Sequence, residues 1–382
     1  MKSLNGRHQT DLPLRVLVVG MTNRVGGLET FIMNYCEQLA GANVYFDFLC
    51  RFPACSFSSR IIEMGGKIYH ITRRSKNPLK FYLEIHAFFK KHAMEYDVIW
   101  DNECMMNDLT PLQLAARYGI PRRIYHSHNA DNVDASWKGR IQGMLHQYHR
   151  KRAGRVITDF WACSHEAAQW AFPNAVFERK AYRIIPDAVS TEVFRYDAAV
   201  RDECRKALGI NDAYVVGNVG HLHHAKNQTF LLDAFTAFRH QYPDALLMLV
   251  GEGADRDMLQ RKAVTLGIAE AVRFMGHRDD VPRLLQAMDL FVMPSHFEGL
   301  GIAAVEAQIS GLPCVLSEQL PRIVKFRENV VFTPIDDAQQ WSAAMARVRE
   351  RQGIRTDGCA AARTAGYDIR VEASRLYDLW RS

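Results

Sequence analysis

The first half of the chain alternates short apolar runs with amphipathic stretches of helical length. Seven runs are rich in β-branched and aromatic residues and have the length of strands, at residues 15–20, 44–49, 67–71, 96–100, 122–126, 160–164 and 182–185. Strands that alternate with helices are typical of a parallel sheet, because each parallel strand needs a crossover connection. The pattern therefore predicts a doubly wound α/β domain.

A second series of the same kind follows Pro186. Its strand candidates lie at residues 214–219, 245–250, 272–275, 290–293 and 314–316. A proline cannot readily continue a central strand, so residues 185–189 are predicted to link two domains. We expect Rossmann-like domains at 1–187 and 188–366. A final helix at 367–382 should return to the first domain.

The sequence predicts the positions of two helices. Asn227 is a plausible N-cap for a helix over residues 228–240. The C-terminal helix repeats apolar residues every three to four positions, at Val371, Ala373, Leu376, Tyr377 and Leu379. This segment adds no strand to either sheet, so the helix is predicted to cap another part of the protein.

Composition narrows the class of protein. A chain of 382 residues fits two domains, and 48% hydrophobic with 24% charged residues is ordinary for a globular protein. The eight cysteines form no C-x-x-C pair and are predicted to be reduced and structural. No apolar run has the length of a membrane span, and residues 1–14 lack the apolar core of a signal peptide. A cytoplasmic location is expected.

The stretch from Met293 to Glu306 carries the strongest chemical signal. A strand, a loop with Gly299 and Gly301, and a helix follow one another. A helix start beside glycines presents free N–H groups and a positive dipole end, which suit a diphosphate. Glu298 and Glu306 can accept hydrogen bonds from sugar and ribose hydroxyls.

A second candidate lies in the loop at residues 217–227. Lys226 can neutralise a phosphate leaving group, and His221 can donate to one. His223 and His224 could instead belong to a solvated turn or a metal-binding tract. No carboxylate or cysteine lies at matching spacing, so we expect no metal.

The loop at residues 26–30 follows the first strand and opens a helix. It lacks the third glycine of a dinucleotide fingerprint, which disfavours NAD. Two histidines, His126 and His128, end the strand at 122–126. A lone histidine is more often structural, so strand position alone does not choose between them.

Glu298 and Glu306 are separated by seven residues, and this stretch resembles the E-x7-E signature of the retaining family-4 glycosyltransferases. The resemblance covers nearly the whole chain and implies the GT-B fold, two Rossmann-like domains that face a central cleft. It implies that the domain at 1–187 binds the acceptor and the domain at 188–366 binds the nucleotide sugar. It implies that Glu298 contacts the donor sugar and Glu306 the ribose. Backbone amides of Gly299, Leu300 and Gly301 would contact the sugar and diphosphate.

The residues from Gly220 to Asn227 resemble the family's G-R-L-x-x-x-K-N element, with His221 in place of arginine. The arginine fork is lost there, and the histidine charge depends on pH. The resemblance makes Lys226 and His221 candidate catalytic residues together with Glu298.

Further family-like elements lie in both halves. Gly26 and Gly27 resemble the G-G-x-E loop near the donor phosphates and acceptor. The turn at Gly276 and His277 resembles the element beside which the family binds the base. The resemblance also assigns a catalytic histidine facing the donor sugar and acceptor, which aligns with His128 rather than His126.

The implied function is that of a hexosyl or N-acetylhexosaminyl transferase, similar to those of capsular or exopolysaccharide synthesis. It would use a nucleoside diphosphate sugar, expected to be a UDP-sugar, and a saccharide or polyprenyl-linked acceptor, without cofactor or nucleic acid. A nucleotide-sugar epimerase of the same architecture, or a non-catalytic binding partner, are the alternatives. Basic and aromatic residues also suggest contact with an anionic membrane at its inner face, at Arg73, Arg74, Lys76, Lys80, Lys90 and Lys91 and at 149–155. The alternative is a core-facing helix whose cationic face is exposed to solvent.

Overall fold

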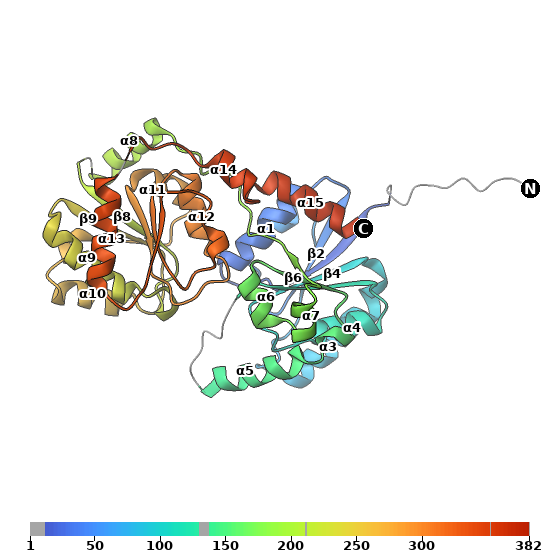
Figure 1. The fold of residues 1–382 in the computed structure, drawn as a ribbon. Helices are drawn as coiled ribbons and strands as arrows, with labels where there is room; N and C mark the ends of the chain where they lie inside the picture. Colours follow the sequence, from blue (N-terminus) through green and yellow to red (C-terminus); the bar gives the residue numbers. More distant parts are fainter. Residues whose placement is uncertain (1–11, 130–136, 211, 352, 382) are drawn as a thin grey trace, which may run out of the picture. The chain divides into compact units, whose positions relative to one another are not determined.

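The computed structural model describes residues 12–129, 137–210, 212–351 and 353–381. They form two compact units: unit 1 is made of residues 1–188 and 369–382, and unit 2 of residues 189–368. Each unit is a parallel sheet with helices on both faces (Figure 1). The predicted α/β class with two doubly wound domains is confirmed. In the part of the chain described, no helix combines the length and hydrophobicity that crossing a bilayer requires.

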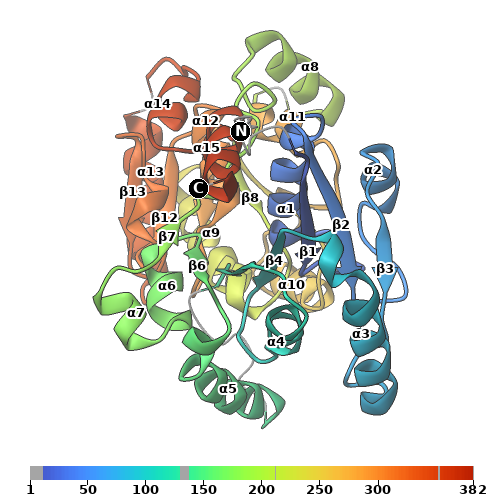
Figure 2. The same ribbon diagram turned by 90° about the vertical axis from the view of Figure 1, so that its right-hand side faces the viewer.

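The sheet of unit 1 has seven parallel strands in the order β3-β2-β1-β4-β5-β6-β7. Figure 2 shows β1, β2 and β3 side by side in this order. The strands are β1 (Leu14–Val19), β2 (Val44–Cys50), β3 (Ile68–His70), β4 (Val98–Glu103), β5 (Arg122–Ser127), β6 (Asp159–Ala162) and β7 (Arg183–Ile184). All seven predicted strands are present, with ends that differ by a few residues.

The helices of unit 1 connect these strands and cover both faces of the sheet. They are α1 (Gly27–Leu39), α2 (Ser58–Glu63), α3 (Pro78–His92), η1 (Ala93–Glu95), α4 (Thr110–Arg117), α5 (Trp137–Arg150), η2 (Ala153–Arg155), α6 (His165–Ala171), α7 (Asn174–Glu178) and α15 (Ile369–Arg381).

The C-terminal helix α15 packs beside α1 (Figures 1 and 2). Its buried residues include Ala373 and Leu376, and also Trp380, whose ring centroid lies 5.4 Å from that of Trp100. Val371, Tyr377 and Leu379 are half-buried, and the last two pack against the same core. The large indole decides the rotation of the helix, because it has the most apolar surface to bury.

The sheet of unit 2 has six parallel strands in the order β10-β9-β8-β11-β12-β13. They are β8 (Tyr214–Val219), β9 (Ala245–Val250), β10 (Val272–Gly276), β11 (Leu290–Met293), β12 (Cys314–Ser317) and β13 (Val330–Thr333). The edge strand β13 was not predicted. Its four residues follow a charged segment, and only β12 pairs with it.

The connecting helices of unit 2 are α8 (Ala198–Leu208), η3 (His224–Lys226), α9 (Gln228–Gln241), α10 (Arg256–Thr265), η4 (Ala269–Ala271), α11 (Val281–Ala287), α12 (Ile302–Ile309), η5 (Arg322–Val324), α13 (Ala338–Glu350) and α14 (Cys359–Thr364). The predicted α9 is present. However, Asn227 precedes it with φ 55°, and its side chain makes no capping hydrogen bond to the described residues. Asn227 therefore occupies the predicted N-cap position, where its carbonyl accepts from the Leu231 N–H at 3.2 Å, without a side-chain bond to the helix.

The order of strands fixes where a ligand can bind in each unit. In unit 2 the chain runs from β8 outward through β9 and β10, then returns to the other side of β8 with β11. The connections that leave β8 and β11 therefore diverge at the carboxyl ends of these strands. In open α/β sheets, ligands bind at such switch points.

Candidate active site

Lys226 and Glu298 meet at the switch point of unit 2. Lys226 ends η3 in the loop after β8, and Glu298 lies in the loop after β11. The Lys226 ammonium donates to both carboxylate oxygens of Glu298, at 2.6 and 2.8 Å. Both side chains are largely buried, so solvent weakens their attraction less than on an open surface. Two residues predicted separately thus form one charged pair.

The loops after β8 and β11 are also joined through their backbones. The His296 N–H donates to the Ala225 carbonyl at 2.9 Å, and the Ser295 hydroxyl donates to Glu298 Oε1 at 2.7 Å. Deeper in the sheet, the Asn218 amide donates to the Val292 carbonyl at 2.8 Å. These bonds hold Glu298 in place before any ligand is bound.

The start of α12 lies directly after this loop. Gly301 precedes the helix with φ 91°, a conformation that favours glycine, and a Cβ there would lie 3.2 Å from Leu320. The Leu300 side chain is buried, which anchors the loop. The first N–H groups of a helix lack intrahelical acceptors, so the amides near Gly299 and Gly301 can serve an anion.

Glu306 lies on the second turn of α12 and is half-buried. Burial raises the pKa of its carboxyl to about 8. No hydrogen bond or ion pair to this carboxyl is found among the described residues. A protonated carboxyl can both donate and accept, which suits a vicinal pair of hydroxyls.

The loop after β8 lies against the turn after β9. A Cβ on Gly251 would come within 2.1 Å of the Gly220 carbonyl oxygen, so only glycine allows this approach. The exposed His221 has Nδ1 3.2 Å from the Glu252 carbonyl. Its position beside Lys226 in the same loop agrees with the sequence, but its imidazole faces a backbone oxygen.

The turn after β10 joins the same edge of the sheet. The Gly251 N–H donates to the Gly276 carbonyl at 2.9 Å, and Gly276 has φ 68°. His277 is exposed, with Nε2 3.4 Å from an Asp279 carboxylate oxygen. The structure therefore brings all the predicted residues of unit 2 to the carboxyl ends of β8, β9, β10 and β11.

In unit 1 the two histidines of β5 differ sharply. His126 is fully buried, and this burial lowers the pKa of its imidazole well below the usual range. His128, one residue beyond the strand, is only partly buried, and its Nε2 lies 3.1 Å from the Asn102 side-chain oxygen. The ring centroids of the two histidines are 4.1 Å apart. His128 is thus the one that can reach a ligand.

Gly26 and Gly27 lie where α1 begins, after the central strand β1. Gly27 has open space at the Cβ position. The buried Glu29 accepts a hydrogen bond from the Thr22 hydroxyl at 2.6 Å, which closes the loop on itself. The loop therefore offers free backbone at the switch point of unit 1, between β1 and β4.

Three residues near these sites were not predicted as functional. Ser295 binds Glu298, and Asp187 and Cys163 lie close to His128. Ser295 lies inside the glycine-rich motif and could have been chosen on that ground. Asp187 was interpreted as linker and Cys163 as core, because no local pattern connects either residue to His128.

Comparison with known proteins decides the family. Residues 200–364 match the model of the family described as Glycosyl transferases group 1. The glycosyltransferase EpsF of Bacillus subtilis (strain 168), as that protein is named, is 30% identical to this chain. The match covers 80% of this chain and 79% of the EpsF chain. The chain belongs to the group 1 glycosyl transferase family. It is an enzyme that transfers sugars.

Other glycosyltransferases resemble this one over most of their length. A UDP-Gal:alpha-D-GlcNAc-diphosphoundecaprenol alpha-1,3-galactosyltransferase of Escherichia coli is 24% identical over 79% of both chains. The crystal structure of HepE from Anabaena in complex with UDP and glucose aligns with a TM-score of 0.79 and 19% identity, over 97% of this chain and 100% of HepE. This likeness shows that the glycosyltransferase has the GT-B fold.

Proposed function

We propose that this glycosyltransferase retains the anomeric configuration and moves a hexosyl or N-acetylhexosaminyl unit from a UDP-sugar. The acceptor is a hydroxyl of a lipid-linked or growing saccharide in cell-envelope polysaccharide synthesis. The observation that carries the proposal is the pair of Lys226 and Glu298 at the carboxyl ends of β8 and β11. It lies beside the free amides of α12, where an anionic ligand is favoured.

Lys226 would stabilise the diphosphate. An ammonium has three donors, and Glu298 takes two of them, which leaves one for a phosphate oxygen. The amides near Gly299, Leu300 and Gly301 add backbone donors. His221, in the same loop as Lys226, can add an imidazole donor. Such donors act most strongly on the charge that develops when the sugar leaves.

The two glutamates would hold the two sugars of the donor. Glu298 is fixed by Lys226 and Ser295, so its carboxylate can position hydroxyls of the transferred sugar. Glu306 lies farther along α12, and the raised pKa of its carboxyl suits hydrogen bonds with the ribose. The turn at Gly276 and His277 is assigned to the base.

The arrangement supports transfer on one face of the sugar. In that step the bond from C1 to the phosphate oxygen breaks, the bond from C1 to the acceptor oxygen forms on the same face, and the phosphate oxygen takes the acceptor proton. Both oxygens of Glu298 already accept bonds from Lys226, so this carboxylate is poorly suited to act as a nucleophile. Configuration at C1 would be retained.

The choice of substrates follows the relatives. The Escherichia coli relative is named for UDP-galactose and a diphosphoundecaprenol-linked acceptor, and HepE was crystallised with UDP and with UDP-glucose. We assign acceptor binding to unit 1, with the loop at Gly26 and Gly27 and the half-buried His128 as its polar groups. No cofactor enters the proposed reaction.

The test is turnover on a lipid-linked saccharide fraction with each UDP-sugar in turn, followed by NMR of the anomeric proton in the product. The expected result is transfer of one sugar with retained configuration, and no change of UDP-sugar when acceptor is omitted. Inverted configuration would contradict the proposed step. Conversion of donor without acceptor would favour an epimerase.

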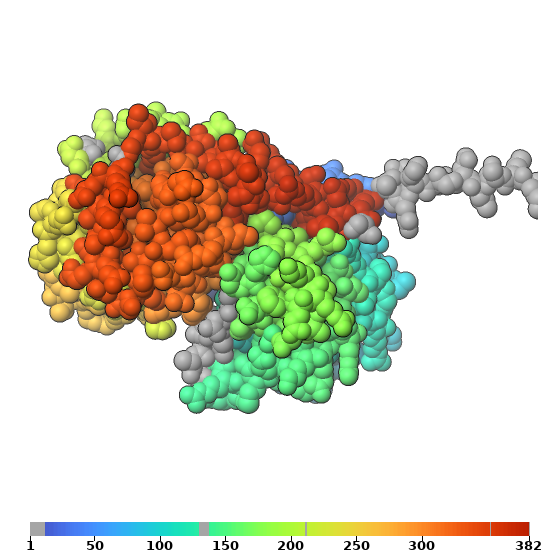
Figure 3. Space-filling view, viewed as in Figure 1, coloured from blue at the N-terminus to red at the C-terminus, as the bar shows by residue number. Residues whose placement is uncertain are grey.

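Because the proposed acceptor is linked to a lipid, we also propose that unit 1 contacts the membrane. Of the predicted basic residues, Arg73 lies over the Phe52 ring and Arg74 pairs with Asp108, so both are already engaged. Helix α5 offers a stronger surface, which Figure 3 shows at the exterior. Its exposed apolar residues repeat along one stripe, at Trp137, Ile141, Met144, Leu145 and Tyr148. Residues 137–155 contain six lysines and arginines and no acidic residue.

This combination favours an anionic lipid surface over a neutral one. Each basic residue near the lipid contributes about 1 kcal/mol. We expect sedimentation with phosphatidylglycerol vesicles that high salt reverses, and less sedimentation after Ile141→Ser with Met144→Ser. Val264→Ser with Met258→Ser, at exposed apolar positions on α10, is the matched control. Equal recovery on phosphatidylcholine vesicles would contradict the contact.

A further inference from the structure

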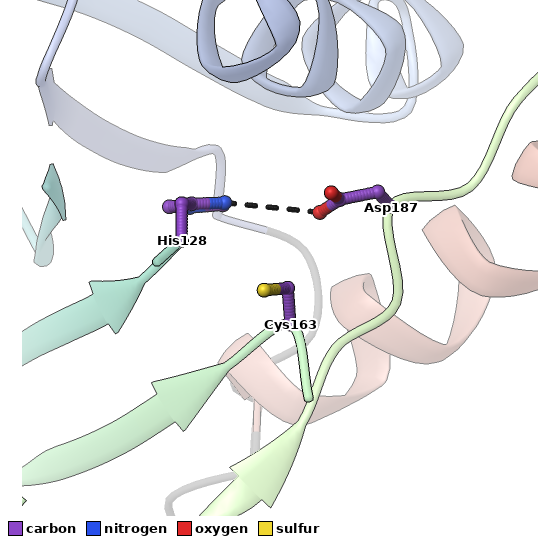
Figure 4. A group of neighbouring side chains, drawn as sticks. All are labelled: His128, Cys163 and Asp187. Atoms are coloured by element: carbon purple, nitrogen blue, oxygen red, sulfur yellow. Dashed lines mark ion pairs between the residues drawn. The ribbon is translucent and has the colours of Figure 1, made fainter. Parts of the chain in front are cut away.

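Three potential metal ligands converge in unit 1, at the carboxyl ends of neighbouring strands. His128 follows β5, Cys163 follows β6, and Asp187 follows β7. Figure 4 shows the His128 imidazole pointing toward the Asp187 carboxylate, with the Cys163 thiol beside the gap between them. One nitrogen, one sulfur and one oxygen atom all lie within 4.8 Å of one another. No motif in the sequence joins these residues, because they lie far apart along the chain.

The spacing of the ligand atoms is close to that of a tetrahedral metal site. Bonds of roughly 2.0–2.3 Å at tetrahedral angles place two ligand atoms about 3.3–3.8 Å apart. His128 Nδ1 and Asp187 Oδ1 are already 3.7 Å apart, which is too far for a hydrogen bond. The thiol needs to approach by about 1 Å at most, a shift that a χ1 adjustment supplies.

The surroundings orient His128 for this role. Its Nε2 faces the side-chain oxygen of Asn102 at 3.1 Å, so Nε2 carries the proton. The tautomer with a protonated Nε2 leaves a lone pair on Nδ1, which points to Asp187 (Figure 4). Histidine ligands of metals are commonly fixed by such an outer hydrogen bond.

Asp187 supplies the second independent observation. Its Oδ1 is buried and makes no hydrogen bond within the described part of the chain. A buried carboxylate oxygen without a partner is costly and calls for a cation or a donor. Among the described residues, its one ion-pair contact is with His128 Nδ1, at 3.7 Å.

We propose that His128 Nδ1, Cys163 Sγ and Asp187 Oδ1 bind one zinc-like divalent ion. Three protein ligands leave the fourth tetrahedral position for water or another oxygen ligand. Imidazole and thiolate together favour Zn²⁺ over Mg²⁺ or Ca²⁺, which prefer oxygen ligands. The inference rests on the geometry of unit 1. Because Nδ1 would bind the ion and Nε2 faces Asn102, a bound ion would prevent the contact between His128 and the acceptor that is proposed above.

Binding must release a proton from Cys163. Its side chain is a free thiol in a buried position. Only the thiolate binds zinc, and the proton leaves to solvent when the sulfur–zinc bond forms. Affinity should therefore rise with pH.

The test is titration of the full chain with Zn²⁺ against a chromophoric chelator, and with Co²⁺ in an absorption spectrometer. We expect one ion per chain, a thiolate-to-cobalt absorption band, and proton release on binding. Cys163→Ser should remove the band, and Asp187→Asn should weaken binding without removing it. Asn102→Ala should weaken binding by about 10–100-fold through the outer hydrogen bond.

Cys104→Ser is the matched control, because this exposed thiol is close enough to Cys163 to act on it electrostatically but lies outside the group of three. It should leave the stoichiometry and the band unchanged. Circular dichroism melting of each variant separates loss of ligand from loss of fold. A parent chain that binds no Zn²⁺, or a band that survives Cys163→Ser in a folded protein, would overturn the proposal.

Discussion

The two units share one architecture but differ in how the polar side chains at their sites are paired. At the switch point of unit 2, Lys226 and Glu298 neutralise each other through bonds of 2.6 and 2.8 Å, and Ser295 adds another. In unit 1, His128 and Asp187 remain 3.7 Å apart, and Asp187 Oδ1 makes no hydrogen bond to a described residue. A molecule that binds to unit 2 would therefore replace existing hydrogen bonds. In unit 1, the Asp187 oxygen has no hydrogen bond to a described residue that would have to be replaced.

Removing the cation of unit 2 should give the largest effect. Lys226→Ala removes the charge that stabilises the departing diphosphate and leaves Glu298 without its main partner. We expect kcat/KM to fall by about 100–1000-fold, as for loss of a donor to a developing oxyanion. Steady-state kinetics with saturating acceptor would measure it. Lys262→Ala is the control, because Lys262 forms an equally short pair with Asp233 in the same unit; a similar loss there would mean that the effect is structural.

The two glutamates should separate binding from turnover. Glu298→Ala should lower kcat by about 10–100-fold through poor positioning of the sugar, while Glu306→Ala should raise the Kd for UDP by about two- to tenfold, the range for a hydrogen bond to a neutral carboxyl. Calorimetry with UDP and initial-rate kinetics give both numbers. If both variants bound and turned over like the parent, the assignment of this helix would be wrong.

In the loop after β8, His221 stands where the similar family element has arginine, and His221→Arg tests the effect of this difference. Because this position is exposed, a new contact with the diphosphate contributes about 1 kcal/mol, or roughly fivefold in donor affinity. His221→Arg should therefore strengthen UDP binding modestly. A clear loss of affinity with an unchanged melting temperature would show that the imidazole serves its contact with the Glu252 carbonyl instead.

Glu306 gives the smallest effect, on stability. The pKa of its carboxyl in the folded chain, about 8, lies above the ordinary value, so the folded state keeps a proton that the unfolded state has lost. The contribution of this carboxyl to the free energy of unfolding is complete below its ordinary pKa and is lost as the pH rises through 8. Glu306→Gln removes this dependence. Its melting temperature relative to the parent should increase from pH 5 to pH 9, by about 2–4 °C per kcal/mol in a unit of this size; a constant difference would contradict it.

Much of the fold could be predicted because the strands are short apolar runs separated by helices. The exception, β13, is an edge strand of four residues paired on one side, so its sequence carries little of the buried pattern. Trp380 was missed for another reason. Periodicity locates a helix, but which side faces the core depends on the partner, here Trp100 of β4.

The donor site could be predicted in part because Glu298, Glu306 and the glycines lie within one strand–loop–helix segment. The bond between Lys226 and Glu298 could not, since the two residues are 72 positions apart and meet only because β11 pairs with β8. The same holds for Asp187. Its closeness to His128 follows from the order β5-β6-β7 in the sheet, which local sequence does not state.

The most direct test of the central claim is calorimetric comparison of UDP and UMP binding to the parent, to Lys226→Ala and to Asp187→Asn. If unit 2 holds the diphosphate through Lys226, the parent should prefer UDP over UMP. That preference should largely disappear in Lys226→Ala and persist in Asp187→Asn. An unchanged preference in a folded Lys226→Ala variant would contradict the assignment of the donor site to the carboxyl ends of β8 and β11.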